Sequence, residues 1–319
     1  MKKNQSMLLS AVVIAAISLT SGIAQADTIY VSNNENSTVE EISNGVSSTL
    51  ISSFLNDPTG IAVYGNDLYV ANNGSPNGGY VAEFTLSGSF VGVVVGGLAS
   101  PRGISFDSAG NLYVANQDSG VIVKVPTGVG VYPSALTTGL GNLNGMTIGG
   151  SGNLYAVSGN GNLYSISTTT GVANILATGL PDGLNNPVGI TYDSVGANAG
   201  NLFVVDNGDH TVVEYNATTG AIVNSPFLTS LNNNSQLDGI AVDTAGNFFI
   251  DDSYTNTVTE YNSLGQFVTA YSSGIAGPCY VTVTSDPLAV PEPSTYLLGL
   301  GGIAALFFYF QRSRQLVRI

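Results

Sequence analysis

Several residue types that commonly stabilise or activate a protein are scarce in this sequence. Its 319 residues include one cysteine, Cys279, so an intramolecular disulfide is impossible and stability must come from a packed core. There is one histidine, His210, which leaves few candidates for a general base near neutral pH. There is no tryptophan, which disfavours a platform that stacks on sugar rings.

Basic residues are also few. Seven Lys and Arg stand against 21 Asp and Glu, for a formal net charge of -14. Five of the seven lie in the two terminal segments, and the other two are Arg102 and Lys124. Because so acidic a surface repels phosphate backbones, we expect no nucleic-acid partner.

The first 26 residues have the organisation of a secretory signal peptide. Lys2 and Lys3 precede an apolar stretch over 7–17, and the segment ends in Ala24-Gln25-Ala26, a small-x-small pattern. The apolar stretch is shorter than the roughly 20 residues that a spanning helix needs. We therefore expect signal peptidase to cleave after Ala26.

The last 33 residues, 287–319, contain three elements in a fixed order. A Pro-Glu-Pro element is followed by an apolar segment over 296–310 and then by a basic tip. The residues concerned are Val290, Pro291, Glu292 and Pro293 in the first element and Arg312, Arg314 and Arg318 in the tip. This arrangement resembles the PEP-CTERM sorting signal.

That resemblance implies processing by an exosortase-type enzyme, with transient anchoring of 296–310 in the inner membrane. Basic residues beside an apolar segment independently favour a cytoplasmic position for that end. Together the two ends predict an exported protein of the cell envelope, cell surface or extracellular space.

Between the ends the sequence repeats itself. Glycines followed by an apolar residue recur at intervals of 43, 42, 44 and 50 residues, close to the roughly 40 to 45 residues of one propeller blade. The glycines are Gly60, Gly103, Gly145, Gly189 and Gly239. The excess length of the last interval lies at 195–200 and 225–236, which we interpret as polar loop insertions.

Short β-branched and aromatic runs with Gly and Asn turns predict several strands in each repeat. Residues 29–33 form a second strand without a first, and residues 278–283 form a first strand without a second. We therefore predict an all-β, six-bladed β-propeller over 27–286, closed by pairing of its N- and C-terminal strands.

The segment Asn201-Leu202-Phe203-Val204-Val205-Asp206, followed by Asn207 and His210, resembles the NHL repeat. The arginine of that repeat is replaced throughout this sequence, so a function that uses a basic face is not implied. The replacing residues are Thr38, Val121, Thr211 and Thr257. A seven-bladed ring of the virginiamycin B lyase type is the alternative.

The residue before each repeated glycine should lie near the mouth of the central channel. These residues are Thr59, Arg102, Asn144, Val188, Asp238 and Cys279. Asn144-Gly145 and Asp238-Gly239 resemble metal-binding pairs of the six-bladed gluconolactonase family, which implies a site for Ca²⁺ or another divalent cation involving Arg102, Asn144 and Asp238. No Glu occupies an equivalent position and Arg102 adds positive charge, so we expect no cofactor there.

Three other features have structural explanations. His210 is expected in a polar turn of the repeat. The sequence has no second histidine that could form a thiolate pair with Cys279, so we expect Cys279 to be a small buried residue. The Asp-rich segments 206–209 and 251–252 could hold Ca²⁺ weakly, but turn chemistry accounts for them.

The sequence as a whole favours a non-catalytic exported propeller that binds an extracellular polysaccharide or protein, or serves a structural role, at the cell surface or in an exopolysaccharide matrix. The alternative is a metal-dependent lactonase or hydrolase, or a streptogramin-lyase-like enzyme, that uses the channel mouth.

Overall fold

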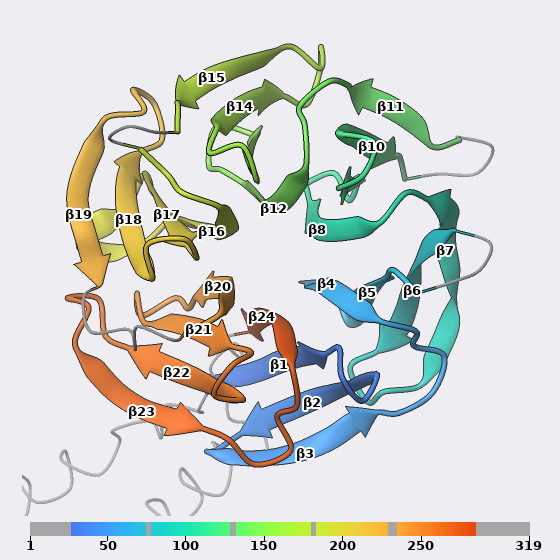
Figure 1. The fold of residues 1–319 in the computed structure, drawn as a ribbon. Helices are drawn as coiled ribbons and strands as arrows, with labels where there is room; N and C mark the ends of the chain where they lie inside the picture. The colour runs from blue at the N-terminus through green and yellow to red at the C-terminus, as the bar shows by residue number, and fades with distance from the viewer. Residues whose placement is uncertain (1–26, 75–77, 128–131, 180–182, 229–234, 285–319) are drawn as a thin grey trace, which may run out of the picture. The chain divides into compact units, whose positions relative to one another are not determined.

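The computed structural model describes residues 27–74, 78–127, 132–179, 183–228 and 235–284. These residues form six four-stranded antiparallel sheets arranged as blades around a central channel (Figure 1). The predicted six-bladed propeller is confirmed. The predicted signal peptide and the sorting segment with its apolar helix lie outside the described residues.

Each of the first three blades runs from an inner strand at the channel to an outer strand at the rim. Blade 1 comprises β4 (Pro58–Tyr64), β5 (Asp67–Asn72), β6 (Gly79–Thr85) and β7 (Phe90–Leu98). Blade 2 comprises β8 (Pro101–Phe106), β9 (Leu112–Asn116), β10 (Val121–Val125) and β11 (Ser134–Thr137). Blade 3 comprises β12 (Leu143–Ile148), β13 (Asn153–Ser158), β14 (Leu163–Ser167) and β15 (Ala173–Ala177).

Blades 4 and 5 repeat this order, and blade 6 joins the two ends of the domain. Blade 4 comprises β16 (Pro187–Asp193), β17 (Asn201–Asp206), β18 (Thr211–Asn216) and β19 (Ile222–Leu228), with a 3-10 turn at Gly196–Asn198. Blade 5 comprises β20 (Leu237–Val242), β21 (Phe248–Asp252), β22 (Thr257–Tyr261) and β23 (Phe267–Tyr271). Blade 6 comprises β24 (Pro278–Thr284), β1 (Thr28–Asn33), β2 (Thr38–Ser43) and β3 (Val46–Ile51).

The ring closes where β24 pairs with β1. The antiparallel register places Val281 opposite Val31 and Val283 opposite Ile29, so the inner strand of blade 6 comes from the C-terminal end of the domain and its other three strands from the N-terminal end. This is the predicted closure. It gives β1 a hydrogen-bonding partner on both sides, which protects its backbone from pairing with other chains.

Hydrophobic packing between neighbouring blades holds the ring together. Six buried clusters correspond to the six boundaries between blades. At the boundary of blades 4 and 5, for example, the rings of Phe203 and Phe248 pack with centroids 4.4 Å apart. The second strands are mostly buried because a neighbouring blade covers each of their faces, whereas the outer strands are largely exposed.

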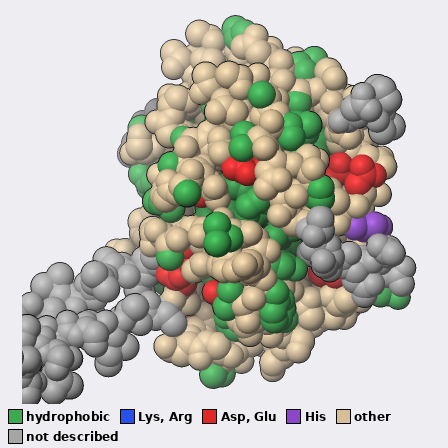
Figure 2. All heavy atoms as spheres, turned by 90° about the vertical axis from the view of Figure 1, so that its left-hand side faces the viewer, with side chains coloured by type: hydrophobic (Ala, Val, Ile, Leu, Met, Phe, Trp, Pro, Cys, Tyr) green, Lys and Arg blue, Asp and Glu red, His purple; other side chains and the backbone are tan. Residues whose placement is uncertain are grey.

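One loop prediction was wrong. Residues 225–228 belong to β19 and pair with β18, so they are not part of a polar loop insertion. The exposed side chains Ile222 and Val223 fit the rim of the blade, where one face of an edge strand meets solvent. Figure 2 shows this side of the molecule: hydrophobic side chains lie among neutral polar ones, acidic groups supply the visible charge, and no Lys or Arg of the described residues is visible.

A recurring side-chain contact explains the Asn and Asp residues that end the second strands. In five blades this side chain accepts a hydrogen bond from a backbone N–H just before the inner strand, at 2.8 to 3.3 Å. The pairs are Asn72 with Asn56, Asn116 with Ala99, Asp206 with Asn185, Asp252 with Gln236, and Asn33 with Ala276. These carboxylates and amides therefore hold the loop that enters the blade, as turn chemistry predicts.

Candidate functional site at the central channel

The inner strands share a β-bulge at the residue before the repeated glycine. In blade 1, Pro58 pairs with Asn72 and Ile61 with Val70, so two residues, Thr59 and Gly60, lie opposite Ala71. The same shift occurs in the other inner strands. A bulge redirects the side chain of the extra residue, which explains why these positions converge on the channel.

The glycines after the bulge allow the inner strands to approach one another closely. A Cβ atom on Gly60 would lie 1.9 Å from the backbone oxygen of Arg102, and one on Gly145 would lie 2.4 Å from that of Val188. No side chain fits at such distances. Blade 6 departs from the pattern, because Tyr280 occupies the equivalent position beside Cys279.

The structure brings Arg102 and Asn144 together at the end of the channel where the inner strands begin. The Arg102 guanidinium Nη1 donates a 3.4 Å hydrogen bond to Asn144 Oδ1, which also accepts 2.8 Å from Gln117 Nε2. Asn144 Nδ2 donates to the backbone oxygen of Pro187 at 2.8 Å. Both polar atoms of the Asn144 side chain are thus hydrogen-bonded within the protein.

Asp238 belongs to the same group of residues. Its Oδ2 accepts a 2.9 Å hydrogen bond from Ser253 Oγ. Burial raises the pKa of Asp238 to about 6, while Ser253 and the nearby positive charge of Arg102 oppose the rise. Burial lowers the pKa of Arg102, whereas the nearby Tyr280, Cys279 and Asp238 raise it. The net shift is upward, so Arg102 remains a cation.

Asp251 is a member of this group that the sequence analysis missed as a site residue. Its Oδ1 accepts a 2.8 Å hydrogen bond from the backbone N–H of Gly239, and its Oδ2 has no partner among the described residues. Burial, followed by the charge of Asp238, raises its pKa well above the usual range. The repeat contains a signal for it, because Ala71, Ala115 and Val205 occupy the equivalent strand position.

A divalent cation does not fit this arrangement. A hard cation requires several converging oxygen ligands, but here the Asn144 oxygen accepts two hydrogen bonds from within the protein, and the guanidinium of Arg102 already supplies positive charge beside Asp238. Within the described residues no group of three or more His, Cys, Asp or Glu side chains is placed to hold a metal ion.

Two other residues with reactive side chains were singled out from the sequence. His210 lies in the turn between β17 and β18 with a φ of +54°. Cys279 is buried and free, as predicted, and burial followed by the charge of Asp238 raises the pKa of its thiol. The thiol is therefore protonated and unreactive at neutral pH.

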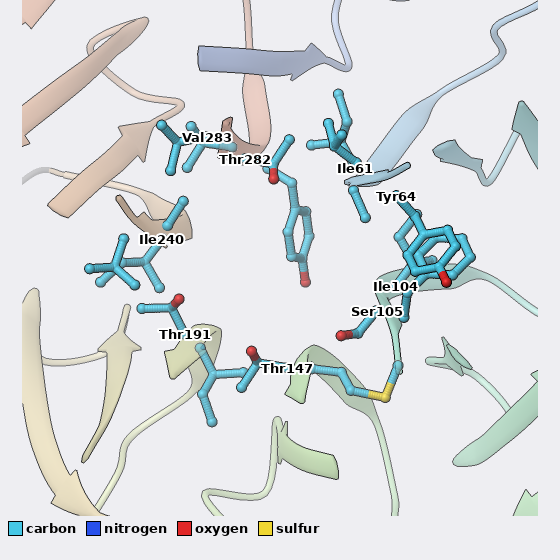
Figure 3. Close-up of a pocket in the computed structure, with 18 of the residues that line it drawn as sticks. Ile61, Tyr64, Ile104, Ser105, Thr147, Thr191, Ile240, Thr282 and Val283 are labelled. Carbon is cyan, nitrogen blue, oxygen red and sulfur yellow. The ribbon is translucent and has the colours of Figure 1, made fainter. Parts of the chain in front are cut away.

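The opposite end of the channel is a cavity of about 410 Å³. Figure 3 shows Ser105, Thr147, Thr191 and Thr282, from four different inner strands, around its opening, with Ile61, Ile104 and Ile240 between them. This end of the channel was not among the sites predicted from the sequence. In the six repeats, the second residue after the glycine position is Ala, Ser or Thr, a periodic signal that could have identified it.

Comparison with known proteins supports both the predicted sorting signal and the predicted propeller fold. Residues 289–315 match the model of the PEP-CTERM protein-sorting motif, which implies export and cell-surface sorting through an exosortase. Comparison of the sequence with curated proteins found no match. Among the described residues, no helix is both long and apolar enough to cross a membrane.

Solved structures share the fold at low sequence identity. The chain is similar to one in a nidogen/laminin complex, with a TM-score of 0.69 and 18% identity over 82% of this chain and 100% of that chain. It is also similar to a streptogramin B lyase, with a TM-score of 0.59, 17% identity and coverage of 83% and 89%. For virginiamycin B lyase from Staphylococcus aureus the TM-score is 0.57, the identity 14% and the coverage 79% and 85%.

Proposed function

We propose that this six-bladed propeller with a PEP-CTERM sorting motif acts without catalysis, as a binding or structural protein at the cell surface or in the exopolysaccharide matrix. In this proposal signal peptidase removes residues 1–26, and an exosortase processes the C-terminal segment. The sorting part rests on the motif at 289–315.

One observation carries the non-catalytic part of the proposal. Arg102 donates to Asn144, and its positive charge opposes the rise of the Asp238 pKa, so the protein's own cation lies beside both candidate ligands at the predicted channel mouth. Metal-assisted hydrolysis needs about three protein ligands and an open coordination position, and general acid-base catalysis needs a titrating group beside the substrate. The described channel residues include no histidine, and Asp251 is buried.

An activity assay tests the proposal against the lactonase, hydrolase and lyase alternatives. We expect the purified protein to show no turnover of lactone, ester or streptogramin panels, with or without added Ca²⁺, Mn²⁺ or Zn²⁺. The Asp238→Ala variant provides the matched control, since it removes a carboxylate from the channel mouth. Metal-dependent turnover by the wild type that disappears in Asp238→Ala would overturn the proposal.

A further inference from the structure

The cavity at the other end of the channel has the features of a small-molecule site. Its volume of about 410 Å³ lies within the usual range for such sites. The lining combines aliphatic side chains, such as Ile61 and Ile240, with the hydroxyl groups of Ser105, Thr147 and Thr191 (Figure 3). Hydroxyl groups both donate and accept hydrogen bonds, so this lining suits a ligand that does the same.

Tyr280 also lines the cavity and carries a polar group without a partner. The residue is 9% exposed, and its hydroxyl makes no hydrogen bond to any described residue. A buried hydroxyl without a partner costs free energy, which a ligand oxygen could recover. Burial raises the pKa of Tyr280, so the hydroxyl remains a neutral donor at physiological pH.

Aromatic rings form one wall of the cavity. Tyr64 and Phe106, which belong to neighbouring inner strands, stack with ring centroids 4.8 Å apart and planes 16° apart. Tyr64 is 37% exposed, so part of this stacked pair faces solvent. The pair supplies an aromatic surface for a ring-shaped ligand in a sequence that has no tryptophan.

Charge selects among the ligands that this lining could accept. Among the described lining residues Asp107 is the one charged side chain, and its carboxylate already accepts hydrogen bonds from Asn111 and Tyr113. No lysine or arginine of the described residues lines the cavity, although Arg102 is close enough to Tyr280 to oppose the rise of its pKa. The formal net charge of -14 adds a repulsive field for acidic sugars.

We propose that this cavity binds one or two units of a neutral saccharide, with hydroxyl groups bonded to Tyr280 and the threonines and a ring face against Tyr64. The inference rests on the proposed surface function and specifies the class of its ligand. The two proposals can fail independently. If no saccharide binds, the saccharide proposal is wrong, but the proposal that the channel mouth is non-catalytic is unaffected.

Calorimetric titration and intrinsic tyrosine fluorescence test the proposal. The probes are trisaccharides of glucose, galactose, mannose and N-acetylglucosamine, with trigalacturonate as the anionic control and octanol as the apolar control. The full chain is used in a zwitterionic detergent without a sugar headgroup. We expect at least one neutral trisaccharide to bind and trigalacturonate not to bind.

Two tyrosine variants locate the site. Tyr280→Phe removes a hydroxyl that has no partner, so the unfolding midpoint should not fall, whereas affinity should fall by about tenfold, the upper end for one neutral hydrogen bond. Tyr80→Phe is the matched control, because its hydroxyl donates to the Phe54 backbone oxygen outside the cavity. Failure of every neutral trisaccharide to bind, preference for trigalacturonate or octanol, or binding insensitive to Tyr280→Phe would overturn the proposal.

Discussion

Replacing Gly60 with alanine should lower the free energy of unfolding by about 3 kcal/mol or more. The new Cβ would lie 1.9 Å from the backbone oxygen of Arg102, which belongs to the neighbouring inner strand. A flexible side chain could move aside, but a backbone oxygen can move only if the inner strands separate. The six hydrophobic clusters between blades oppose that separation. Urea denaturation followed by far-UV circular dichroism measures the loss.

Gly96→Ala is the matched control for Gly60→Ala. Gly96 lies in β7 at the rim, and a Cβ there would meet nothing within 4 Å. Its effect should stay within about 0.5 kcal/mol, as for an ordinary surface substitution. Equal losses in the two variants would contradict the interpretation that the inner-strand glycines serve close packing around the channel.

Replacing Arg102 with methionine should destabilise the protein by about 1 to 2 kcal/mol at neutral pH, because the largely buried Asp238 must then keep an uncompensated charge or take up a proton. The loss should depend on pH. Burial already raises the pKa of Asp238 from 3.8 to about 6, so in the folded state this group holds its proton at a pH where the unfolded chain has released it. The contribution of this group to stability is therefore complete below pH 3.8 and is lost as the pH rises through about 6.

Without Arg102 the pKa of Asp238 should rise further, so the difference between variant and wild type should shrink as the pH falls to 4 and Asp238 becomes neutral. Lys124→Met is the matched control, because it removes the same charge from the other basic residue of the propeller. Lys124 is partly exposed and donates to the Thr168 backbone oxygen at the surface, so its loss should cost less than about 1 kcal/mol. An Arg102→Met penalty that is equal at pH 4 and pH 7 would contradict the charge-compensation account.

The ring architecture was predictable from the sequence because a propeller repeats its geometric requirements. Five of the six inner strands have a residue without a side chain where they meet a neighbouring inner strand, so glycine recurs at a nearly constant interval. The incomplete repeats at the two ends then imply closure, which the pairing of β24 with β1 confirms. The length of an interval does not by itself show where a loop is inserted. Residues 225–228 lie in the long interval between Gly189 and Gly239, but they belong to strand β19.

The candidate site was less predictable, because it depends on where long side chains point. The repeat placed Arg102 and Asn144 at equivalent positions of neighbouring blades, but the hydrogen bond between them depends on the conformation of the Arg102 side chain. Asp251 was overlooked because its neighbour Asp252 does have the expected turn role. Asp251 stands out when the second strands are aligned, because other second strands have an apolar residue at its position. Tyr280 stands out in the same way when the inner strands are aligned, because the other five have glycine at its position.

We propose that Arg102 compensates the charge at the channel mouth and that this mouth is not a metal centre. Titration of the wild-type protein with Ca²⁺, Mn²⁺ and Zn²⁺, followed by the thermal unfolding midpoint, tests this most directly, because a ligand that binds the folded state must raise that midpoint. We predict no rise with any of the three ions. A saturable rise in the wild type that is absent in Asp238→Ala would contradict the account.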